Sequence, residues 1–113
     1  MTAGTTVCAY DRLPVERGVC VLVDSEQVAL FRLADGAVHA LGNLDPFSGA
    51  MVLSRGIVGS RGDTPTVASP MYKQVFDLLT GRCLDDETVG TPVHHVRVQD
   101  GQVQVRIGVL AAA

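Results

Sequence analysis

Short apolar segments joined by tight-turn dipeptides recur along most of this chain of 113 residues. Asp35-Gly36 and Asp100-Gly101 each separate two such segments. An Asp-Gly pair favours a two-residue hairpin because both positions accept a positive φ. Residues 102–107 alternate between polar and β-branched side chains, which is the period of a strand with one buried face. Because no longer window shows the helical period, the pattern predicts an all-β fold of antiparallel hairpins.

Apolar content and alternation predict eight or more short strands, which would form a small antiparallel barrel or sandwich. The length predicts one domain over residues 1–113, with an ordered core at about residues 5–107 and a frayed tail at 109–113. The expected strands cover residues 5–9, 19–23, 28–33, 38–41, 75–78, 82–84, 93–98 and 102–107.

Charge and hydropathy exclude two classes of partner. The net charge is -3 and the nine basic residues are scattered, whereas nucleic-acid binding needs a basic stripe. No apolar run approaches the ~20 residues that cross a bilayer. Residues 1–10 lack the charged and apolar segments of a signal peptide, so we expect a cytoplasmic protein that binds neither nucleic acid nor a membrane.

The residues that commonly ligate metals show no ligand spacing. Three cysteines without a close pair predict neither a disulfide framework nor a zinc site, and Cys20, within an apolar run, is expected to be buried. His94 and His95 are adjacent in a predicted strand, so their side chains should point to opposite faces and cannot easily share one metal. Asp45, Asp63 and Asp77 could supply a carboxylate pair, although loop aspartates are usually turn formers.

Residues 42–76 interrupt the strand pattern. They hold three of the five prolines and five of the twelve glycines, and this composition predicts one long loop. Loops of such length in a compact domain are usually functional or disordered. Residues 56–62 are glycine-rich, but their spacing matches neither the dinucleotide fingerprint nor the phosphate-binding loop.

Two peptides in this segment have the framing of a metal clamp. They are Asp-Pro-Phe at residues 45–47 and Ser-Pro-Met-Tyr at residues 69–72, and Phe-Asp-Leu-Leu-Thr-Gly-Arg-Cys-Leu follows at residues 76–84. This order resembles the Rieske ferredoxin fold, in which a Cys-Pro-His loop and a Cys-Pro-x-His-Gly loop hold a [2Fe–2S] centre. The resemblance implies an all-β, Rieske-like (ISP-type) antiparallel β-sandwich or barrel with a cluster-loop subdomain.

The ligand positions of that family carry other residues in this chain: Asp45, Phe47, Ser69 and Tyr72. Thiolates and imidazoles suit iron–sulfur clusters, whereas a carboxylate, a phenyl ring, a hydroxyl and a phenol do not. A Rieske electron carrier would need cysteine and histidine at these positions. We therefore expect no [2Fe–2S] cluster on this chain, and we expect Phe47 and Tyr72 to fill the space as a hydrophobic plug.

Residues 43–50, 53–59 and 67–74 resemble one subgroup, the small subunit of assimilatory NAD(P)H-dependent nitrite reductase. The resemblance implies a non-catalytic subunit in nitrate assimilation, which supports six-electron reduction of nitrite to ammonium by a large subunit. That large subunit would carry flavin, an iron–sulfur cluster and sirohaem. No catalytic, cofactor-binding or metal-binding residue is then expected on this chain. The alternative is a stand-alone Rieske-like binding or regulatory module without a cluster.

The long segment also supplies the expected contact surface. Apolar side chains in a glycine-rich loop, with basic residues around them, would form an interface with a charged rim. The alternative is that these apolar residues fold back onto the core. The interface candidates are Met51, Leu53, Arg55, Ile57, Arg61 and Lys73.

Overall fold

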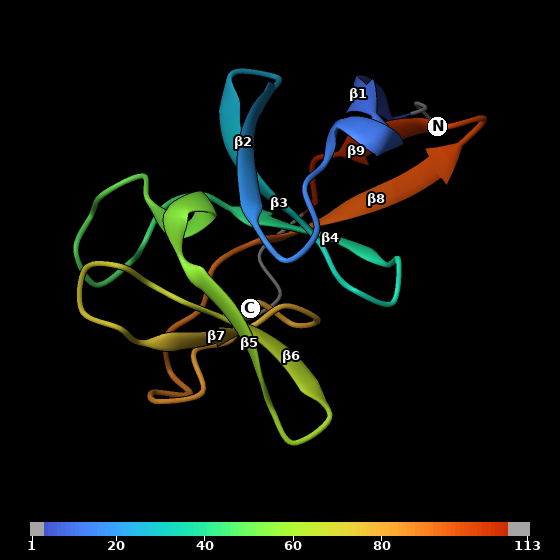
Figure 1. Cartoon of the computed structure of the whole chain (residues 1–113). Coiled ribbons are helices and arrows are strands. Elements are labelled where there is room, and N and C mark those ends of the chain that lie inside the picture. Colours follow the sequence, from blue (N-terminus) through green and yellow to red (C-terminus); the bar gives the residue numbers. More distant parts are fainter. Residues whose placement is uncertain (1–3, 109–113) are drawn as a thin grey trace.

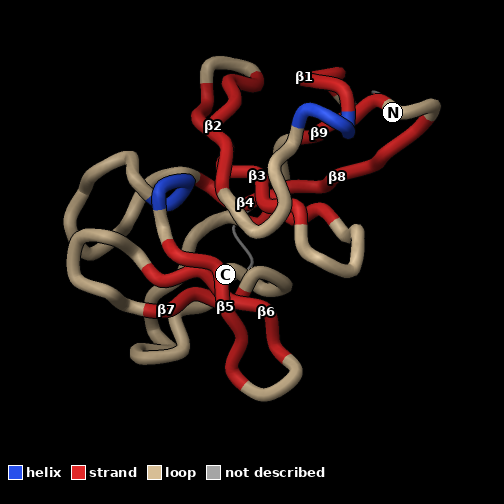
Figure 2. Tube along the Cα trace, viewed as in Figure 1, coloured by secondary structure: helices blue, strands red, loops and turns tan. Residues whose placement is uncertain are grey.

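The computed structural model describes residues 4–108, which fold into nine strands in two antiparallel sheets (Figures 1 and 2). The expected frayed tail at 109–113 lies outside these residues. Two short 3-10 helices, η1 (Tyr10–Arg12) and η2 (Leu53–Arg55), complete the structure. The strands are β1 (Thr5–Ala9), β2 (Gly18–Val23), β3 (Glu26–Arg32), β4 (Val38–Gly42), β5 (Ile57–Arg61), β6 (Thr64–Ala68), β7 (Val75–Asp77), β8 (Val93–Gln99) and β9 (Gln102–Arg106).

The larger sheet has six strands in the order β1-β9-β8-β4-β3-β2. Its end strands β1 and β2 also approach each other, so the sheet curls towards a barrel. Of the two expected two-residue Asp-Gly hairpins, only Asp100-Gly101 is present, with φ 53° and 75°. Asp35-Gly36 lies in a longer turn, in which Gly36 alone has a positive φ, 93°, and the Leu33 N–H donates to Ala37 O over 2.8 Å. Asp24 and Ser25 make a third turn of positive φ, at 50° and 68°, between β2 and β3. The prediction of an all-β antiparallel fold is confirmed.

The smaller sheet, β5-β6-β7, lies within the segment that we expected to be one long loop. Gly62, with φ 63°, and Asp63 join β5 to β6 as a two-residue hairpin. Gly62-Asp63 between β-branched segments is itself a hairpin signal. The high proline and glycine content of residues 42–76 nevertheless led to the prediction of a loop. Residues 82–84, expected as a strand, make only isolated bridges, one of them between Phe76 and Cys83.

Two apolar groups form the core, one on each face of β3. The loop-side core joins the six-stranded sheet to the smaller sheet, and the sheet-side core fills the curl of the six-stranded sheet. Because both faces of β3 are covered, four successive residues from Val28 to Phe31 are fully buried. The loop-side core contains Ala29, Phe31, Leu33, Leu41, Leu53, Val67, Phe76, Leu78 and Cys83. The sheet-side core contains Leu13, Val23, Val28, Leu30, Ala40, Val103 and Val105.

The expectation that Cys20 is buried is wrong. Its side chain is exposed, since β2 ends the order of the six-stranded sheet and pairs only with β3. Its Sγ accepts a hydrogen bond of 3.5 Å from the side-chain amide of Asn43. The two adjacent histidines do point to opposite faces, with His94 buried and His95 exposed.

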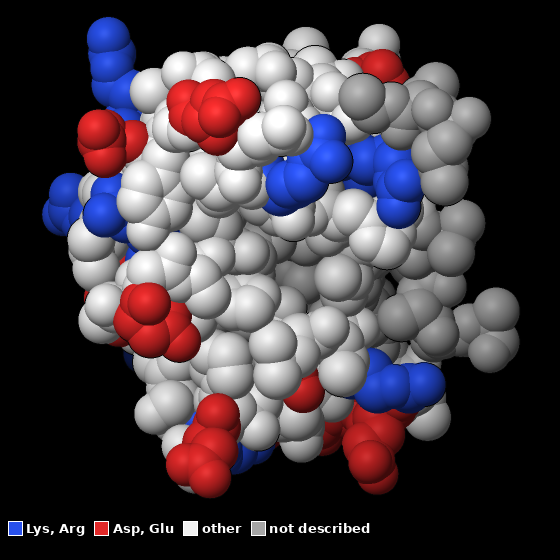
Figure 3. Space-filling model, turned by 90° about the vertical axis from the view of Figure 1, so that its right-hand side faces the viewer, with Lys and Arg blue, Asp and Glu red and all other residues white. Residues whose placement is uncertain are grey.

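The surface of the described residues is mixed in charge. On the face drawn in Figure 3, acidic and basic side chains form small separate groups over a largely uncharged surface. This face therefore carries no continuous basic stripe among the described residues, of the kind that phosphate backbones select. Within residues 4–108, no helix is long and apolar enough to cross a membrane.

Candidate functional site

Two loops lie side by side at one end of the molecule, on the left of Figure 1. The first cluster loop is residues 43–52, after β4, and the second is residues 69–74, between β6 and β7. Each loop closes on itself through main-chain bonds. The Asp45 N–H donates to Ala50 O over 2.8 Å, and the Ser69 N–H donates to Gln74 O over 2.9 Å.

A buried hydrogen bond between Ser69 and Asp45 ties the two loops together. The Ser69 hydroxyl donates to Asp45 Oδ2 over 2.5 Å, and the two residues are 1% and 0% exposed. Each side chain also accepts a bond within its own loop. The Phe47 N–H donates to Asp45 Oδ1 over 2.9 Å, and the Met71 N–H donates to Ser69 Oγ over 3.2 Å. Both residues stand at positions that carry metal ligands in the Rieske family. A polar pair therefore joins the loops where a metal cluster would otherwise do so.

The Asp45 carboxyl is held in its ionised form. Burial raises its pKa, but hydrogen bonds from the Ser69 hydroxyl, the Phe47 N–H and Ser48 outweigh it and leave the pKa below its ordinary value. A buried carboxylate is tolerated only where donors replace its water. Asp45 is therefore a structural acceptor whose two oxygens are committed to this chain.

Asn43 organises the base of the first cluster loop and was not among our candidates. It is 2% exposed, and its amide nitrogen donates to Gln27 Oε1 over 3.0 Å and to Met51 O over 3.1 Å. Its Oδ1 accepts the Ser54 N–H over 2.7 Å. A buried amide that bonds three segments fixes their relative positions, because each lost bond would leave an unsatisfied group. The Gly-Asn pair after β4 was the only local signal for this role.

The expected hydrophobic plug is half wrong. Phe47 is partly buried against the loop-side core, with its ring centroid 6.2 Å from that of Phe76. Tyr72 instead is 61% exposed. Lys73 adopts a φ of 65°, and the tight turn that it completes leaves the Tyr72 ring outside. The Asp45–Ser69 hydrogen bond holds the two loops together without the Tyr72 ring.

These positions do not fit a [2Fe–2S] centre. Asp45 and Ser69 bond each other, Phe47 has no donor atom, and Tyr72 faces solvent. Across residues 4–108, no group of three or more His, Cys, Asp or Glu side chains could hold a metal ion. Cys83 is fully buried in the loop-side core.

The structure separates the interface candidates into two groups. Arg55 and Lys73 are exposed, as are Met51 (49%) and Ile57 (76%). The expectation that Leu53 lies in the interface is wrong. Its side chain is fully buried, because η2 turns it into the loop-side core.

Three further exposed apolar residues of the two cluster loops were missed as interface candidates. Leu44 forms a bridge with Met51, and Met71 and Tyr72 lie in the second cluster loop. We call the four exposed residues Leu44, Met51, Met71 and Tyr72 the loop-tip patch. Exposed apolar residues on two neighbouring loops are typical of contact surfaces.

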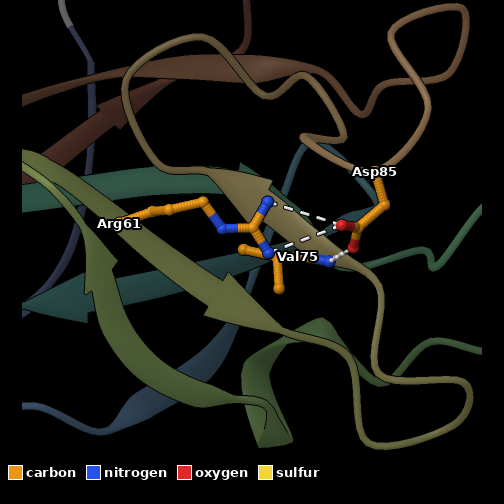
Figure 4. Close-up of polar contacts among 3 residues, drawn as sticks. All are labelled: Arg61, Val75 and Asp85. Atoms are coloured by element: carbon orange, nitrogen blue, oxygen red, sulfur yellow. Dashed lines mark hydrogen bonds and ion pairs between the residues drawn. The ribbon is translucent and has the colours of Figure 1, made fainter.

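Arg61 is exposed but already paired. Its two terminal nitrogens lie 3.4 Å from Asp85 Oδ1, and Asp85 Oδ2 accepts the Val75 N–H over 2.9 Å (Figure 4). The contact links the β5–β6 hairpin to the start of β7. Because both side chains are about half exposed, at 52% and 41%, the ion pair contributes little to stability. Since the Arg61 charge is already paired within this chain, Arg61 is a weaker candidate than Arg55 or Lys73 for the charged rim of an interface.

Comparison with known proteins agrees with this geometry. The Rieske-like [2Fe-2S] domain family matches residues 4–106. The NADH nitrite reductase small subunit of Escherichia coli K12 is 41% identical over 107 residues, which are 94% of this chain and 99% of that protein. The chain belongs to the nitrite reductase small-subunit family of Rieske-like domains. A crystal structure assigned to this subunit from Mycobacterium tuberculosis superposes with a TM-score of 0.90, at 57% identity, over 96% of this chain and all of that one.

A further relative is a large subunit. The nitrite reductase [NAD(P)H] large subunit of Klebsiella oxytoca is 41% identical to this chain over 99 residues, which are 88% of this chain but 10% of that protein. A small-subunit-like segment is thus joined covalently to a large subunit in that relative. The resemblance that the loop sequences indicated is confirmed.

Proposed function

We propose that this chain is the non-catalytic small subunit of an NAD(P)H-dependent nitrite reductase. It supports the six-electron reduction of nitrite to ammonium by a large subunit that carries flavin, an iron–sulfur cluster and sirohaem. The observation that carries the proposal is the near full-length match to the E. coli small subunit, at 41% identity and 99% of its length. The three free cysteines are in keeping with a reducing, cytoplasmic location.

The partner proposal rests on the Klebsiella relative. Where a small-subunit-like segment is part of the large-subunit chain, its effective concentration at the rest of that chain is high. A separate chain has no such linker and must bind through its own surface. The family relationship therefore supports a non-covalent complex between this chain and a large subunit.

The loop-tip patch, flanked by Arg55 and Lys73, is the contact surface that we propose. Its four apolar side chains are between 41% and 61% exposed. The Asp45–Ser69 bond fixes the two loops against each other, so the patch does not need a partner to take shape. A rigid apolar centre with charged residues around it is a common interface arrangement. In this role the chain contributes no catalytic residue and no cofactor of its own.

The test is reconstitution with the isolated large subunit. We expect one complex by size exclusion with light scattering, and a higher rate of NAD(P)H-dependent nitrite reduction when this chain is added. Met51→Lys and Tyr72→Asp should each weaken the complex about tenfold or more, since a charge would be desolvated within the contact.

Val98→Lys is the matched control. Val98 is also an exposed apolar residue, at 43%, but it lies near the tip of the β8–β9 hairpin, on the other side of the molecule from the loops (Figure 1). It should leave the complex unchanged. If the wild-type chain neither binds the large subunit nor alters its turnover, the stand-alone module becomes the better account. If all three variants bind alike, the contact lies elsewhere on the surface.

A further inference from the structure

The outer side of β5 is an open strand edge. β5 ends the three-stranded sheet, whose order is β5-β6-β7, and within residues 4–108 no strand pairs with its other side. An open edge exposes main-chain donors and acceptors that another extended chain can pair with. Ile57, Gly59, Ser60 and Arg61 are all exposed, so the described residues cover little of this strand.

The register identifies which main-chain groups of β5 point outward. Ser60 lies opposite Pro65, which has no N–H, so these two residues cannot exchange a pair of bonds. The Pro65 carbonyl instead accepts the Leu78 N–H over 3.0 Å and so points away from β5. Because bonded and non-bonded pairs alternate in an antiparallel ladder, Val58 and Ser60 direct their N–H and C=O groups to the open edge.

Nothing in the strand blocks this edge. Proteins commonly protect an edge with charged side chains, proline or a bulge, and β5 has no proline or bulge over its five regularly paired residues. Its one charged residue, Arg61, is at its end and is paired with Asp85. Its first residue, Ile57, is 76% exposed, more than any other large apolar side chain in the described residues. Ile57 also pairs with Ala68, directly before the second cluster loop. The start of this edge therefore lies beside the second cluster loop, which carries Met71 and Tyr72.

We propose that β5 accepts an extended segment of the large subunit as a fourth strand of this sheet. Val58 and Ser60 would make the main-chain bonds, and an apolar side chain of the partner would cover Ile57. Main-chain pairing at an exposed edge, with pockets for alternate side chains, is a common mode of peptide recognition. The inference rests on the proposed function, since the occupant is the same partner that contacts the loop-tip patch.

A second copy of this chain fits the edge less well. Two-fold pairing of β5 with itself would centre on Gly59, since Val58 would then lie opposite Ser60 of the other copy. That register sets the apolar Ile57 against Arg61 at each end. Arg61 is also drawn to Asp85 on its own chain. A partner strand of different sequence could place an apolar side chain opposite Ile57 and leave the Arg61–Asp85 ion pair in place.

Amide hydrogen exchange on the full chain, free and bound to the large subunit, tests the inference residue by residue. In the free chain the Val58 and Ser60 amides should exchange fast, while the Gly59 amide, bonded to β6, is protected. Binding should slow Val58 and Ser60 by about tenfold or more. A complex in which both amides keep their free rates would overturn the inference but leave the proposed function standing.

Two other outcomes would also overturn the inference. If both amides exchange slowly in the free chain, and more slowly at higher chain concentration, a second copy of the chain occupies the edge. Failure to form any complex with the large subunit would remove the proposed function and this inference together.

Ser60→Pro provides a second measurement. Proline removes the outward N–H, whereas the β5–β6 bonds remain because they involve Ile57, Gly59 and Arg61. Ser60→Ala is the control, since it keeps the N–H and removes only the hydroxyl. We expect Ser60→Pro to raise the Kd for the large subunit about tenfold or more and Ser60→Ala to change it less than about twofold. Equal Kd values for two folded variants would contradict the inference. If Ser60→Pro does not fold, the exchange pattern of the wild-type chain decides.

Discussion

The six-stranded sheet and the cluster-loop region, meaning the two cluster loops with β5–β7, share one apolar core but are shaped by different forces. The six-stranded sheet follows from alternating apolar residues and positive-φ turns, with Val103 and Val105 fully buried on one face of β9. The ends of the cluster loops are fixed by buried polar side chains, chiefly Asn43 and the Asp45–Ser69 pair. The first arrangement is set by local pattern, and the second by contacts between distant residues.

This difference explains how the loops can keep a defined shape without ligands. In a cluster-bearing relative, metal bonds would hold the two loops together. Here one hydrogen bond between residues 24 positions apart joins them, and Phe47 packs the first loop against Phe76. A surface shaped by protein bonds alone is suited to contact with another protein.

The largest expected effect is at the core that both regions share. Phe76→Ala removes a fully buried ring between the two sheets and should lower the free energy of unfolding by about 3–5 kcal/mol. Leu79→Ala, at a residue that is 55% exposed, is the control and should cost less than about 0.5 kcal/mol. Urea denaturation measures both. A loss below about 1 kcal/mol for Phe76→Ala would mean that the two sheets do not depend on this contact.

The polar pair should matter next, and locally. Ser69→Ala leaves Asp45 Oδ2 and the Met71 N–H without their partner and should cost about 1–3 kcal/mol. Hydrogen exchange should rise in residues 43–52 and 69–74, while the amides of β8 and β9 should change little. Ser60→Ala, at an exposed serine, is the matched control. Uniform loss of protection across the chain would contradict the separation of the two regions.

The two regions should also respond to acid at different pH. Burial lowers the pKa of His94 below its ordinary 6.5, and its Nδ1 accepts the Gly108 N–H. The unfolded chain therefore binds the proton first, and stability falls as the pH drops below about 6.5. His94→Gln should reduce the slope of the stability profile between about pH 7 and 5, and the slope that remains would include His39, whose pKa burial also lowers.

Asp45 affects stability in a lower pH range than His94. Its carboxyl pKa lies below the ordinary 3.8, so its contribution is complete above that value and is lost only as the pH falls through the lower folded pKa. Ser69→Ala should lower stability by a constant amount near neutral pH and change the slope of the profile only in this acid range. Denaturation at a series of pH values separates the two effects, and a Ser69→Ala profile whose slope departs from that of the wild type near pH 6.5 would contradict it.

The smallest effect is expected at the exposed ion pair. Arg61→Ala breaks its contact with Asp85 and should cost less than about 1 kcal/mol, because both side chains are about half in water. Added salt should reduce the difference from wild type further. A loss above about 2 kcal/mol would show that this contact holds the β5–β6 hairpin in place.

The sequence predicted the elements whose signals are local. Alternation and Asp-Gly turns indicated the β8–β9 hairpin and most of the six-stranded sheet, and the loop motifs indicated the family. The β5–β6 hairpin was missed because Pro65 and the glycines argued against strands. Pro65 is accommodated because its side of the pair with Ser60 needs no N–H.

The errors at the candidate site have a different origin. Whether Leu53 enters the core, or Tyr72 leaves it, depends on how the loops are held by Asn43 and by the Asp45–Ser69 bond. These contacts join residues far apart in the sequence. No periodicity marks them, so exposure in the loops could not be predicted from the chain alone.

The central claim is that the two loops form a protein contact surface without a metal cluster. Calorimetric titration of the large subunit with this chain, after its iron and sulfide content has been measured, tests that claim most directly. We predict saturable one-to-one binding by chain that holds no stoichiometric iron, and weaker binding by Tyr72→Asp. Binding that appears only after a [2Fe–2S] cluster has been built into the chain would contradict the account.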